Sequence, residues 1–385
     1  MYMTVPFFFF YIVFAVISPY LAILFRGLGY SPFMIGIFLG IFEGAGVVGP
    51  FVFGHFADKI GRYKPGLLIT NALVLAAALP LALFRNPLVT ALLTLALGLG
   101  FRSALPLLEA VTTLAIGRTG DYGKIRTAGS VSFILMTLFF QAALILPVNT
   151  PVNIALWIVI TTFLTMISIV FIPPAYETKG VHETKQAGSH EWQGADKGKR
   201  GIWSAMLIAG LIIMALNRLG MSSVYGFFSL YLTESLQWDA VGLMWALASM
   251  AEVPFMFLSR RIIGRFGAFN CLAVSTTALI LRMLLYAFFP FKAGIILAQT
   301  LHSLCFGLFH PAAIAFISTC VPPERRALGM SLYLSLGSGL PTFAGNILGG
   351  FIVEHAGYRA MFGAFTVFPV IAVGMYAVTL LQRRR

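Results

Sequence analysis

The feature of this sequence that most constrains its fold is a series of long apolar runs that few charges interrupt. Each run spans about 20 residues or more, the length of an α-helix that crosses the hydrocarbon core of a bilayer. Charged residues make up 10% of the chain, whereas a soluble protein carries about 25%. The runs do not alternate with period two, as the strands of a membrane barrel do. The sequence therefore predicts an all-α integral membrane protein.

Twelve such runs can be counted, and they divide into two sets of six. The expected spans are residues 4–25, 33–56, 65–84, 87–117, 123–145, 152–173, 202–230, 240–259, 268–288, 293–319, 327–351 and 357–381. Between the sixth and seventh spans lies a long polar stretch, whose charge and glycine content predict a flexible linker. We therefore expect an N-terminal six-helix bundle at 1–174, a cytoplasmic linker at 175–201 and a C-terminal six-helix bundle at 202–385.

The placement of lysine and arginine predicts the orientation in the membrane. The chain has 26 of these residues against 13 acidic ones, a formal net charge of +13. With a cytoplasmic N-terminus, 19 of the 26 fall in cytoplasmic segments and four on the opposite side, as the positive-inside rule requires. We expect a multi-pass protein of the inner (cytoplasmic) membrane with both termini cytoplasmic. Because the charge follows topology, we expect no nucleic-acid partner.

The loop after the second span has the sequence GHFADKIGRYK, residues 54–64. It resembles the signature G-x-x-x-D-[RK]-x-G-R-[RK] of the major facilitator superfamily. The matching positions are Gly54, Asp58, Lys59, Gly61 and Arg62. We expect Gly54 to let two helices approach closely, Gly61 to allow a tight turn, and Asp58 to cap or pair with a neighbouring helix end. The resemblance implies twelve helices in two bundles with pseudo-two-fold symmetry, and a motif that acts as a conformational latch.

An internal repeat supports two related halves. The stretch RRIIGRFG, residues 260–267, follows the eighth span as the first motif follows the second. Aligning Gly61 with Gly264 gives an offset of 203 residues, close to the start of the second half. Two parallel six-helix halves are the architecture of one large transporter class.

Ionisable residues inside the spans are candidates for function, because they are costly in hydrocarbon. They are Glu43, Arg102, Glu109, Arg218, Glu252, Arg282, His302 and His310. The set contains three carboxylates and three guanidiniums, which favours ion pairs between helices. For several of these residues a purely structural role remains an alternative. His310 precedes Pro311, and we expect it to bond a backbone carbonyl freed near a kink. The two histidines lie about 80° apart around an α-helix, so we expect no shared metal ion.

Several stretches resemble proton-coupled permeases of the lactose permease type and the related 3-phenylpropionate permease and nucleoside:proton symporter group. They are DYGKIRTAGS (121–130), LEAV (108–111), GLMWALASMAEVPFMF (242–257), LILRML (279–284) and AQTLHSL (298–304). The resemblance implies a substrate-binding pair of Glu109 and Arg126. It further implies that Glu252 binds substrate and links it to protonation, with Arg282 and His302 as coupling residues.

One position departs from the lactose permease pattern. Cys305 stands where that permease carries its proton-bearing glutamate. The phenylpropionate permease group also lacks this acid and has a second histidine eight residues after the first, here His310. Tyr225 and the glycine after it are similar to the same group. The resemblance therefore favours this group, and we expect the proton to reside on Glu252.

We expect a secondary active transporter, a proton-coupled symporter that takes up a sugar, nucleoside or aromatic acid by alternating access. The predicted substrate-binding residues are Glu109, Arg126, Glu252, Tyr20, Tyr225 and Arg102. The predicted proton-coupling residues are Glu252, Arg282, His302 and Glu43. Protonation of Glu109 or of His302 remains an alternative. Because Arg102 and Arg218 carry positive charge, a substrate with a carboxylate group also remains an alternative.

The alternative is a proton-driven efflux antiporter for drugs or metabolites, although residues 129–147 lack the G-x-x-x-G-P-x-x-G-G signature typical of that class. We expect no enzyme, because no nucleophile–base pair, H-E-x-x-H motif or phosphate loop appears. The three cysteines fall singly in apolar segments, so we expect no disulfide framework, metal site or cofactor. The expected coupling ion is a proton, and sodium is the alternative. The expected partners are a small solute and the lipid bilayer, and we expect a monomer.

Overall fold

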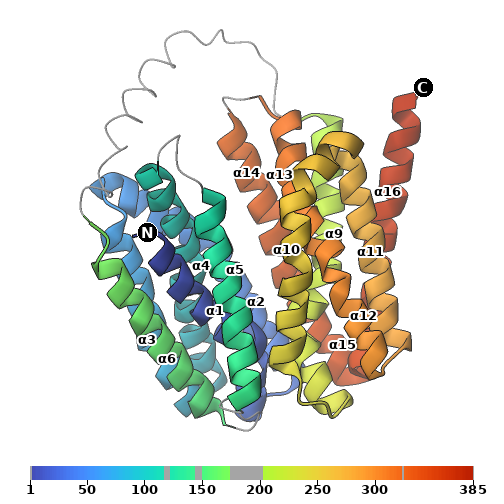
Figure 1. The fold of residues 1–385 in the computed structure, drawn as a ribbon. Coiled ribbons are helices and arrows are strands. Elements are labelled where there is room, and N and C mark those ends of the chain that lie inside the picture. Colours follow the sequence, from blue (N-terminus) through green and yellow to red (C-terminus); the bar gives the residue numbers. More distant parts are fainter. Residues whose placement is uncertain (1, 117–121, 144–149, 174–202, 323–324, 385) are drawn as a thin grey trace. The chain divides into compact units, whose positions relative to one another are not determined.

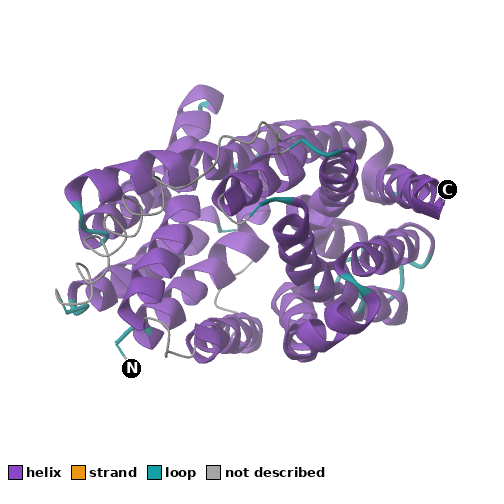
Figure 2. Ribbon diagram, turned by 90° about the horizontal axis from the view of Figure 1, so that it is seen from above, coloured by secondary structure: helices purple, strands orange, loops and turns teal. Residues whose placement is uncertain are grey.

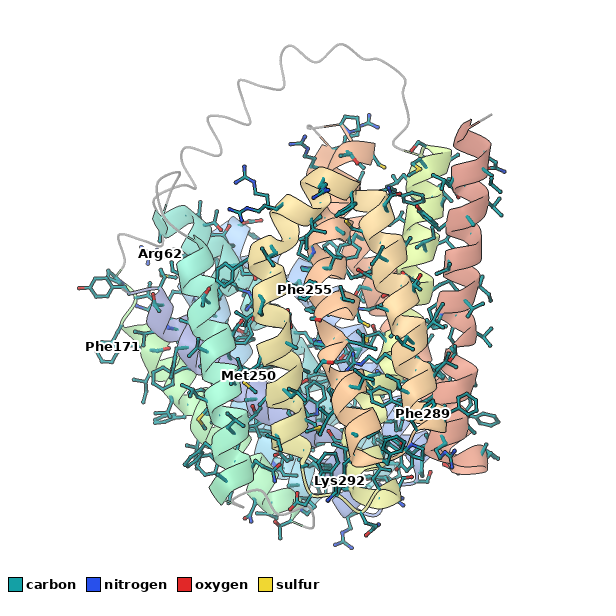
Figure 3. All side chains as sticks on the ribbon, turned by 45° about the vertical axis from the view of Figure 1, so that its right-hand side comes forward. Arg62, Phe171, Met250, Phe255, Phe289 and Lys292 are labelled. Atoms are coloured by element: carbon teal, nitrogen blue, oxygen red, sulfur yellow. The ribbon has the colours of Figure 1, made fainter. Side chains whose placement is uncertain are left out.

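A computed structural model describes the chain apart from residues 1, 117–121, 144–149, 174–202, 323–324 and 385. The described residues form helices joined by short loops, with no strand among them (Figures 1 and 2). This confirms the all-α fold class. Large apolar side chains such as Phe171, Met250 and Phe289 project outward (Figure 3), as the lipid-facing side of a membrane helix requires.

The helices of the first half match the first six predicted spans to within a few residues. They are α1 (Thr4–Gly27), α2 (Pro32–Ile60), α3 (Lys64–Leu83), α4 (Pro87–Ile116), α5 (Tyr122–Ala143) and α6 (Pro151–Val170). Three of them begin at a proline, and α3 has one in its first turn. Proline suits this position because its missing N–H would have no partner within the helix. At the start of α3, Lys64 Nζ donates to the carbonyls of Val170, the last residue of α6, and of Ile172 just after it.

The second half contains helices that π-helical turns interrupt. Its elements are α9 (Ala205–Leu230), η1 (Tyr231–Ser235), α10 (Val241–Phe266), α11 (Ala268–Phe288), α12 (Lys292–Thr300), η2 (Ser303–Leu308), α13 (Phe309–Cys320), α14 (Arg326–Leu334), η4 (Ser335–Gly339), α15 (Leu340–Phe365) and α16 (Val367–Arg384). The segments η1, η2 and η4 are π-helical. Such turns are rare in proteins overall, and those that occur often lie at functional sites.

Eleven helical runs of the described chain are long and apolar enough to cross a membrane. The last, Leu328–Gln382, has 55 residues, which at about 1.5 Å per residue is more than twice the thickness of a bilayer core. Gly357 breaks this run with a φ of 82°. Counted as two passes, the run brings the total to the twelve spans predicted.

The chain divides into two compact units. The first comprises residues 1–17, 45–136 and 152–201, and the second comprises 18–44, 137–151 and 202–385. The helices α1, α2 and α5 therefore each contribute to both units. The boundaries predicted for the two bundles stay a prediction, and the whole of the predicted linker lies outside the described residues.

The turn after α10 lies three residues beyond the glycine that the predicted repeat aligns with Gly61. The helix α10 continues to Phe266, so Gly264 lies inside it. Gly267 ends that helix with a φ of 81°, as Gly61 follows α2 with a φ of 73°. Gly267, rather than Gly264, therefore makes the turn in the second half that Gly61 makes in the first. Both glycines adopt a left-handed conformation that other residues seldom reach.

Candidate functional site

A buried arginine lies at the centre of a polar network in the second unit. Arg282 of α11 is 1% exposed. Its Nε donates to the Tyr286 hydroxyl at 3.0 Å, its Nη2 donates to Gln299 Oε1 at 2.5 Å, and its Nη1 lies 2.9 Å from His302 Nδ1. All three acceptors are neutral. The cost of burying this charge is therefore offset by hydrogen bonds rather than by direct pairing with a carboxylate.

His302 joins Arg282 to Glu252 of α10. Its Nε2 lies 3.7 Å from Glu252 Oε2. An arginine N–H can only donate, so His302 Nδ1 has to accept, and the proton of a neutral imidazole then sits on Nε2 and faces Glu252. A protonated His302 would also carry a hydrogen on Nδ1, and this N–H would face the N–H of Arg282 Nη1. The geometry therefore favours a neutral His302 whose Nε2–H faces Glu252.

Glu252 itself is partly accessible, with a side chain 18% exposed. Its Cγ packs against Gly307 of η2, where an added Cβ would lie 3.0 Å away. Glu252, His302 and Arg282 therefore meet, as the sequence predicted. His302 lies between Arg282 and Glu252 and contacts both.

The π-helical turn η2 aligns three rings. His302 and Phe306 stack with centroids 5.6 Å apart and planes 3° apart, and Phe306 and His310 stack at 5.7 Å and 9°. The predicted 80° separation of the histidines assumed a continuous α-helix and does not hold across this turn. His310 Nδ1 lies 3.0 Å from the Tyr333 hydroxyl, a partner that was not predicted. The described residues contain no cluster of metal-ligating side chains.

Arg218 of α9 lies beside this stack. Its Nε donates to Ser338 Oγ at 2.8 Å, and its guanidinium lies 5.5 Å from the Tyr225 ring centroid and 5.4 Å from that of Phe306. No carboxylate of the described chain lies within 4 Å of this guanidinium. Each cation–π contact is worth about 0.5–2 kcal/mol, so the two rings offset part of the roughly 2.5–3.5 kcal/mol cost of an arginine at the centre of a membrane helix. They lower this cost without neutralising the charge.

Tyr225, a predicted substrate-binding residue, belongs to the same cluster. Its ring centroid lies 6.2 Å from that of Trp245 and 6.3 Å from that of His302. The Trp245 indole donates to Ser229 Oγ at 3.0 Å, which fixes its orientation. The second unit thus presents an aromatic wall beside its charged network.

The first unit holds the other predicted binding residues. The Arg126 guanidinium on α5 lies 4.5 Å from the centroid of the buried Tyr11 ring. An added Cβ at Gly129, one turn on, would meet the same ring, so the glycine makes room for it. Glu109 and Arg102 are half-buried on α4. Pairing of Glu109 with Arg126 stays a prediction, and sequence analysis missed Tyr11.

Tyr20 and Glu43 belong to the second unit. Tyr20 is 4% exposed on α1, and Glu43 is half-buried on α2 beside Gly44. Gly44 packs against Phe343 of α15. The substrate and coupling roles predicted for Tyr20 and Glu43 stay predictions.

The superfamily motif closes the end of α2. Gly61 makes the predicted turn, and Arg62 is exposed (Figure 3). Asp58 accepts a hydrogen bond from the Tyr63 hydroxyl at 3.1 Å, and among the described residues no arginine pairs with it. Burial, followed by the charge of Asp58, raises the pKa of Tyr63. No described atom lies within 4 Å of an added Cβ at Gly54, so the close approach expected there is wrong for this structure.

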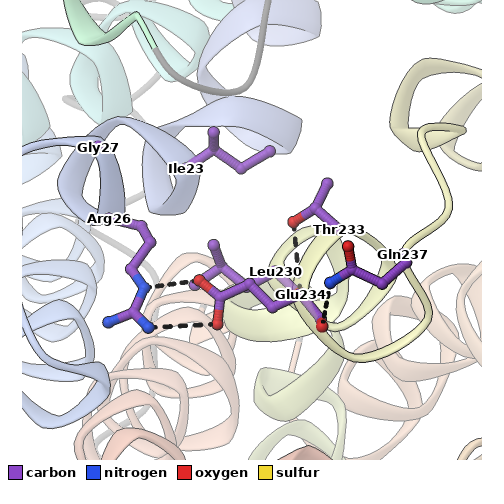
Figure 4. Close-up of a pocket in the computed structure, with 7 residues that line it drawn as sticks. All are labelled: Ile23, Arg26, Gly27, Leu230, Thr233, Glu234 and Gln237. Atoms are coloured by element: carbon purple, nitrogen blue, oxygen red, sulfur yellow. Dashed lines mark hydrogen bonds and ion pairs between the residues drawn. The ribbon is translucent and has the colours of Figure 1, made fainter.

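A second polar cluster fastens the far ends of α1 and η1 to each other. Arg26 Nε lies 2.6 Å from Glu234 Oε1, and the Tyr358 hydroxyl donates to Glu234 Oε2 at 2.7 Å. The pair borders a cavity of about 440 Å³ (Figure 4). Close by, Glu354 of α15 accepts hydrogen bonds from Ser31 Oγ and the backbone N–H of Phe33. Sequence analysis missed this cluster.

Comparison with known proteins places these features in a family. The model of the MFS_1 like family matches residues 1–364. The chain belongs to this family. It is 25% identical over 377 residues to a probable 3-phenylpropionic acid transporter of Escherichia coli (strain K12), covering 94% of this chain and 92% of that protein.

Two further likenesses are more limited. A maltose permease of Geobacillus stearothermophilus is 27% identical over 144 residues, which span 37% of this chain and 36% of the permease. The crystal structure of the nucleoside transporter NupG matches with a TM-score of 0.78 at 17% identity, covering 98% of both chains. The latter likeness supports the fold alone. Family and neighbours are membrane transporters of small solutes, and the chain is a multi-pass membrane protein of this kind.

Proposed function

We propose that the chain is a proton-coupled symporter that takes up a small organic solute, such as a sugar, nucleoside or aromatic acid, by alternating access. The observation that carries the proposal is the network of Glu252, His302 and Arg282, which three membrane-spanning helices bring together. Ionisable residues inside membrane helices mark substrate and ion pathways by default. The relatives' names point to aromatic acids, maltose and nucleosides as solute classes.

In this mechanism Glu252 takes up the coupling proton. His302 presents its Nε2–H to the carboxylate, and Arg282 holds the imidazole in that tautomer through Nδ1. Protonation removes the charge that His302 stabilises, so the contact weakens when the proton binds. Coupling requires that proton and solute each favour the same change of conformation.

The aromatic side chains supply a surface for the solute. Tyr225, Trp245 and Phe306 lie within contact of one another or of His302. An aromatic face stacks on the apolar face of a sugar, a base or a phenyl ring. We place the protein in the inner membrane as a monomer with both termini cytoplasmic.

The test is transport in proteoliposomes with an imposed pH gradient. A gradient of one unit supplies about 1.4 kcal/mol, so a one-to-one symporter accumulates its solute up to about tenfold. We expect Glu252→Gln to abolish accumulation and retain exchange of labelled for unlabelled solute, since exchange needs no net proton movement. Glu191→Gln, in the predicted linker, is the matched control and should behave as the unchanged protein.

Two outcomes count against the proposal. Uptake of every bound solute that ignores the gradient would exclude proton coupling, and full accumulation by Glu252→Gln would remove Glu252 from it. Solute extrusion against inward proton flow would establish the efflux alternative.

A further inference from the structure

The charges of the second unit's cluster do not balance. Arg218 and Arg282 stand against a single carboxylate, Glu252, among the described contacts of the cluster. The Arg282 guanidinium donates hydrogen bonds to three neutral acceptors within the protein. Arg218 commits its Nε to Ser338, and its terminal nitrogens bind no carboxylate of the described chain.

Arg218 also remains accessible. It is half-buried, as are Tyr225, Phe306 and Ser338 around it, whereas Arg282 is buried. A planar guanidinium fork matches the two oxygens of a carboxylate. The two rings beside it offer faces to an apolar or aromatic group.

From this juxtaposition we infer that the solute is an organic monocarboxylate with an apolar or aromatic body, and that Arg218 binds its carboxylate. The inference rests on the proposed function, because it assigns the substrate class of the same site. A sugar or a nucleoside carries no anionic group, so it would leave the surplus positive charge of the cluster uncompensated. A single carboxylate matches that surplus of one.

A carboxylate bound at Arg218 also couples the solute to the proton. When Glu252 is protonated, the charge surplus of the cluster rises by one, so the anion binds more tightly. By thermodynamic reciprocity, the bound anion favours protonation of Glu252 by the same factor. The other titratable groups of the described residues that face this region are His302, His310, Tyr225, Tyr286, Tyr333 and Cys305, and in their neutral forms they add no charge.

The experiment compares acids with their neutral amides. The apparent melting temperature of the purified full-length chain is measured against 3-phenylpropionate and 3-phenylpropanamide, benzoate and benzamide, maltose and uridine. A ligand that binds the folded state raises this temperature. We expect at least one acid to stabilise the protein and its amide to have no effect at the same concentration.

Variants then assign the carboxylate contact. We expect Arg218→Gln to lower the affinity for the acid at least tenfold, and Arg218→Lys to lower it less, since lysine keeps the charge but loses the fork. Arg261→Gln removes the same charge at an exposed position of α10 and should match the unchanged protein. If Arg218→Gln does not fold, the affinity of Arg218→Lys for the acid and the comparison of acids with amides on the unchanged chain still test the assignment.

Equal stabilisation by acid and amide, undiminished acid binding by Arg218→Gln, or stabilisation by maltose or uridine alone would each overturn the assignment. The two proposals fail separately. A neutral solute that accumulates with the pH gradient overturns the assignment and leaves symport standing. An acid that binds through Arg218 without responding to the gradient does the reverse.

Discussion

Gly36 of α2 packs against α15 where the helices leave no room for a side chain. An added Cβ would clash with the carbonyl oxygen of Asn346 and lie 3.1 Å from Cα of Gly350. Real Cβ atoms essentially never come within 3.0 Å of such neighbours, and a backbone carbonyl cannot rotate away. Overpacking costs about 1–3 kcal/mol, and alanine recovers about 0.5–1 kcal/mol of helix propensity. We therefore expect Gly36→Ala to destabilise the protein by about 1–2 kcal/mol.

Gly374→Ala is the matched control for this substitution. Gly374 lies within α16, and no described atom lies within 4 Å of its added Cβ. Without a steric cost, alanine there should stabilise the helix by about 0.5–1 kcal/mol. Thermal unfolding can be followed with a thiol-reactive dye, because Cys271 and Cys305 are buried and unlabelled until the fold opens. Melting of Gly36→Ala at or above the temperature of Gly374→Ala would refute the packing argument.

Two further predictions concern polar contacts. The Arg26–Glu234 pair is 41% and 29% exposed, so a double-mutant cycle of Arg26→Ala and Glu234→Ala in denaturant unfolding should give a coupling of about 0.2–1 kcal/mol that high salt diminishes. Zero coupling at low salt would mean that the pair contributes nothing. Gln299→Leu removes an acceptor of Arg282 and leaves a buried charged donor unpaired, at a cost of about 1–3 kcal/mol. Gln299→Glu restores an acceptor and should melt well above Gln299→Leu; equal melting of the two variants would contradict the hydrogen-bond argument.

The helical architecture was predictable because the bilayer imposes it. A run of about 20 apolar residues has few alternatives to a spanning helix, since backbone groups have to bond internally in hydrocarbon. Interruptions within a helix were less accessible. The sequence around Ser303–Leu308 reads as one apolar run, and the extra residue of a π-helical turn depends on local packing rather than on hydropathy.

The candidate site was predictable where charge made residues conspicuous. Glu252, His302 and Arg282 stood out because ionisable groups are rare in membrane helices. Gln299 and Tyr11 did not, because polar and aromatic side chains in apolar runs usually serve packing, and their contacts join distant elements. The turn after α10 was hard to place for a related reason: two glycines, Gly264 and Gly267, follow the first basic residues near its end, and only the backbone shows that Gly267 ends the helix.

The two proposals together determine the charge that moves with each turnover. A monocarboxylate that enters with one proton carries no net charge, whereas a sugar or nucleoside with one proton carries +1. One charge moved through 100 mV is worth about 2.3 kcal/mol, and about 1.4 kcal/mol is tenfold. An inside-negative potential of about 100 mV, imposed with potassium and valinomycin at equal pH, should therefore raise accumulation of a neutral solute by about 50-fold and leave that of a carboxylate unchanged. Potential-driven accumulation of a carboxylate would mean that more than one proton enters with each anion, and would overturn the balance of Arg218 and Arg282 against Glu252 alone.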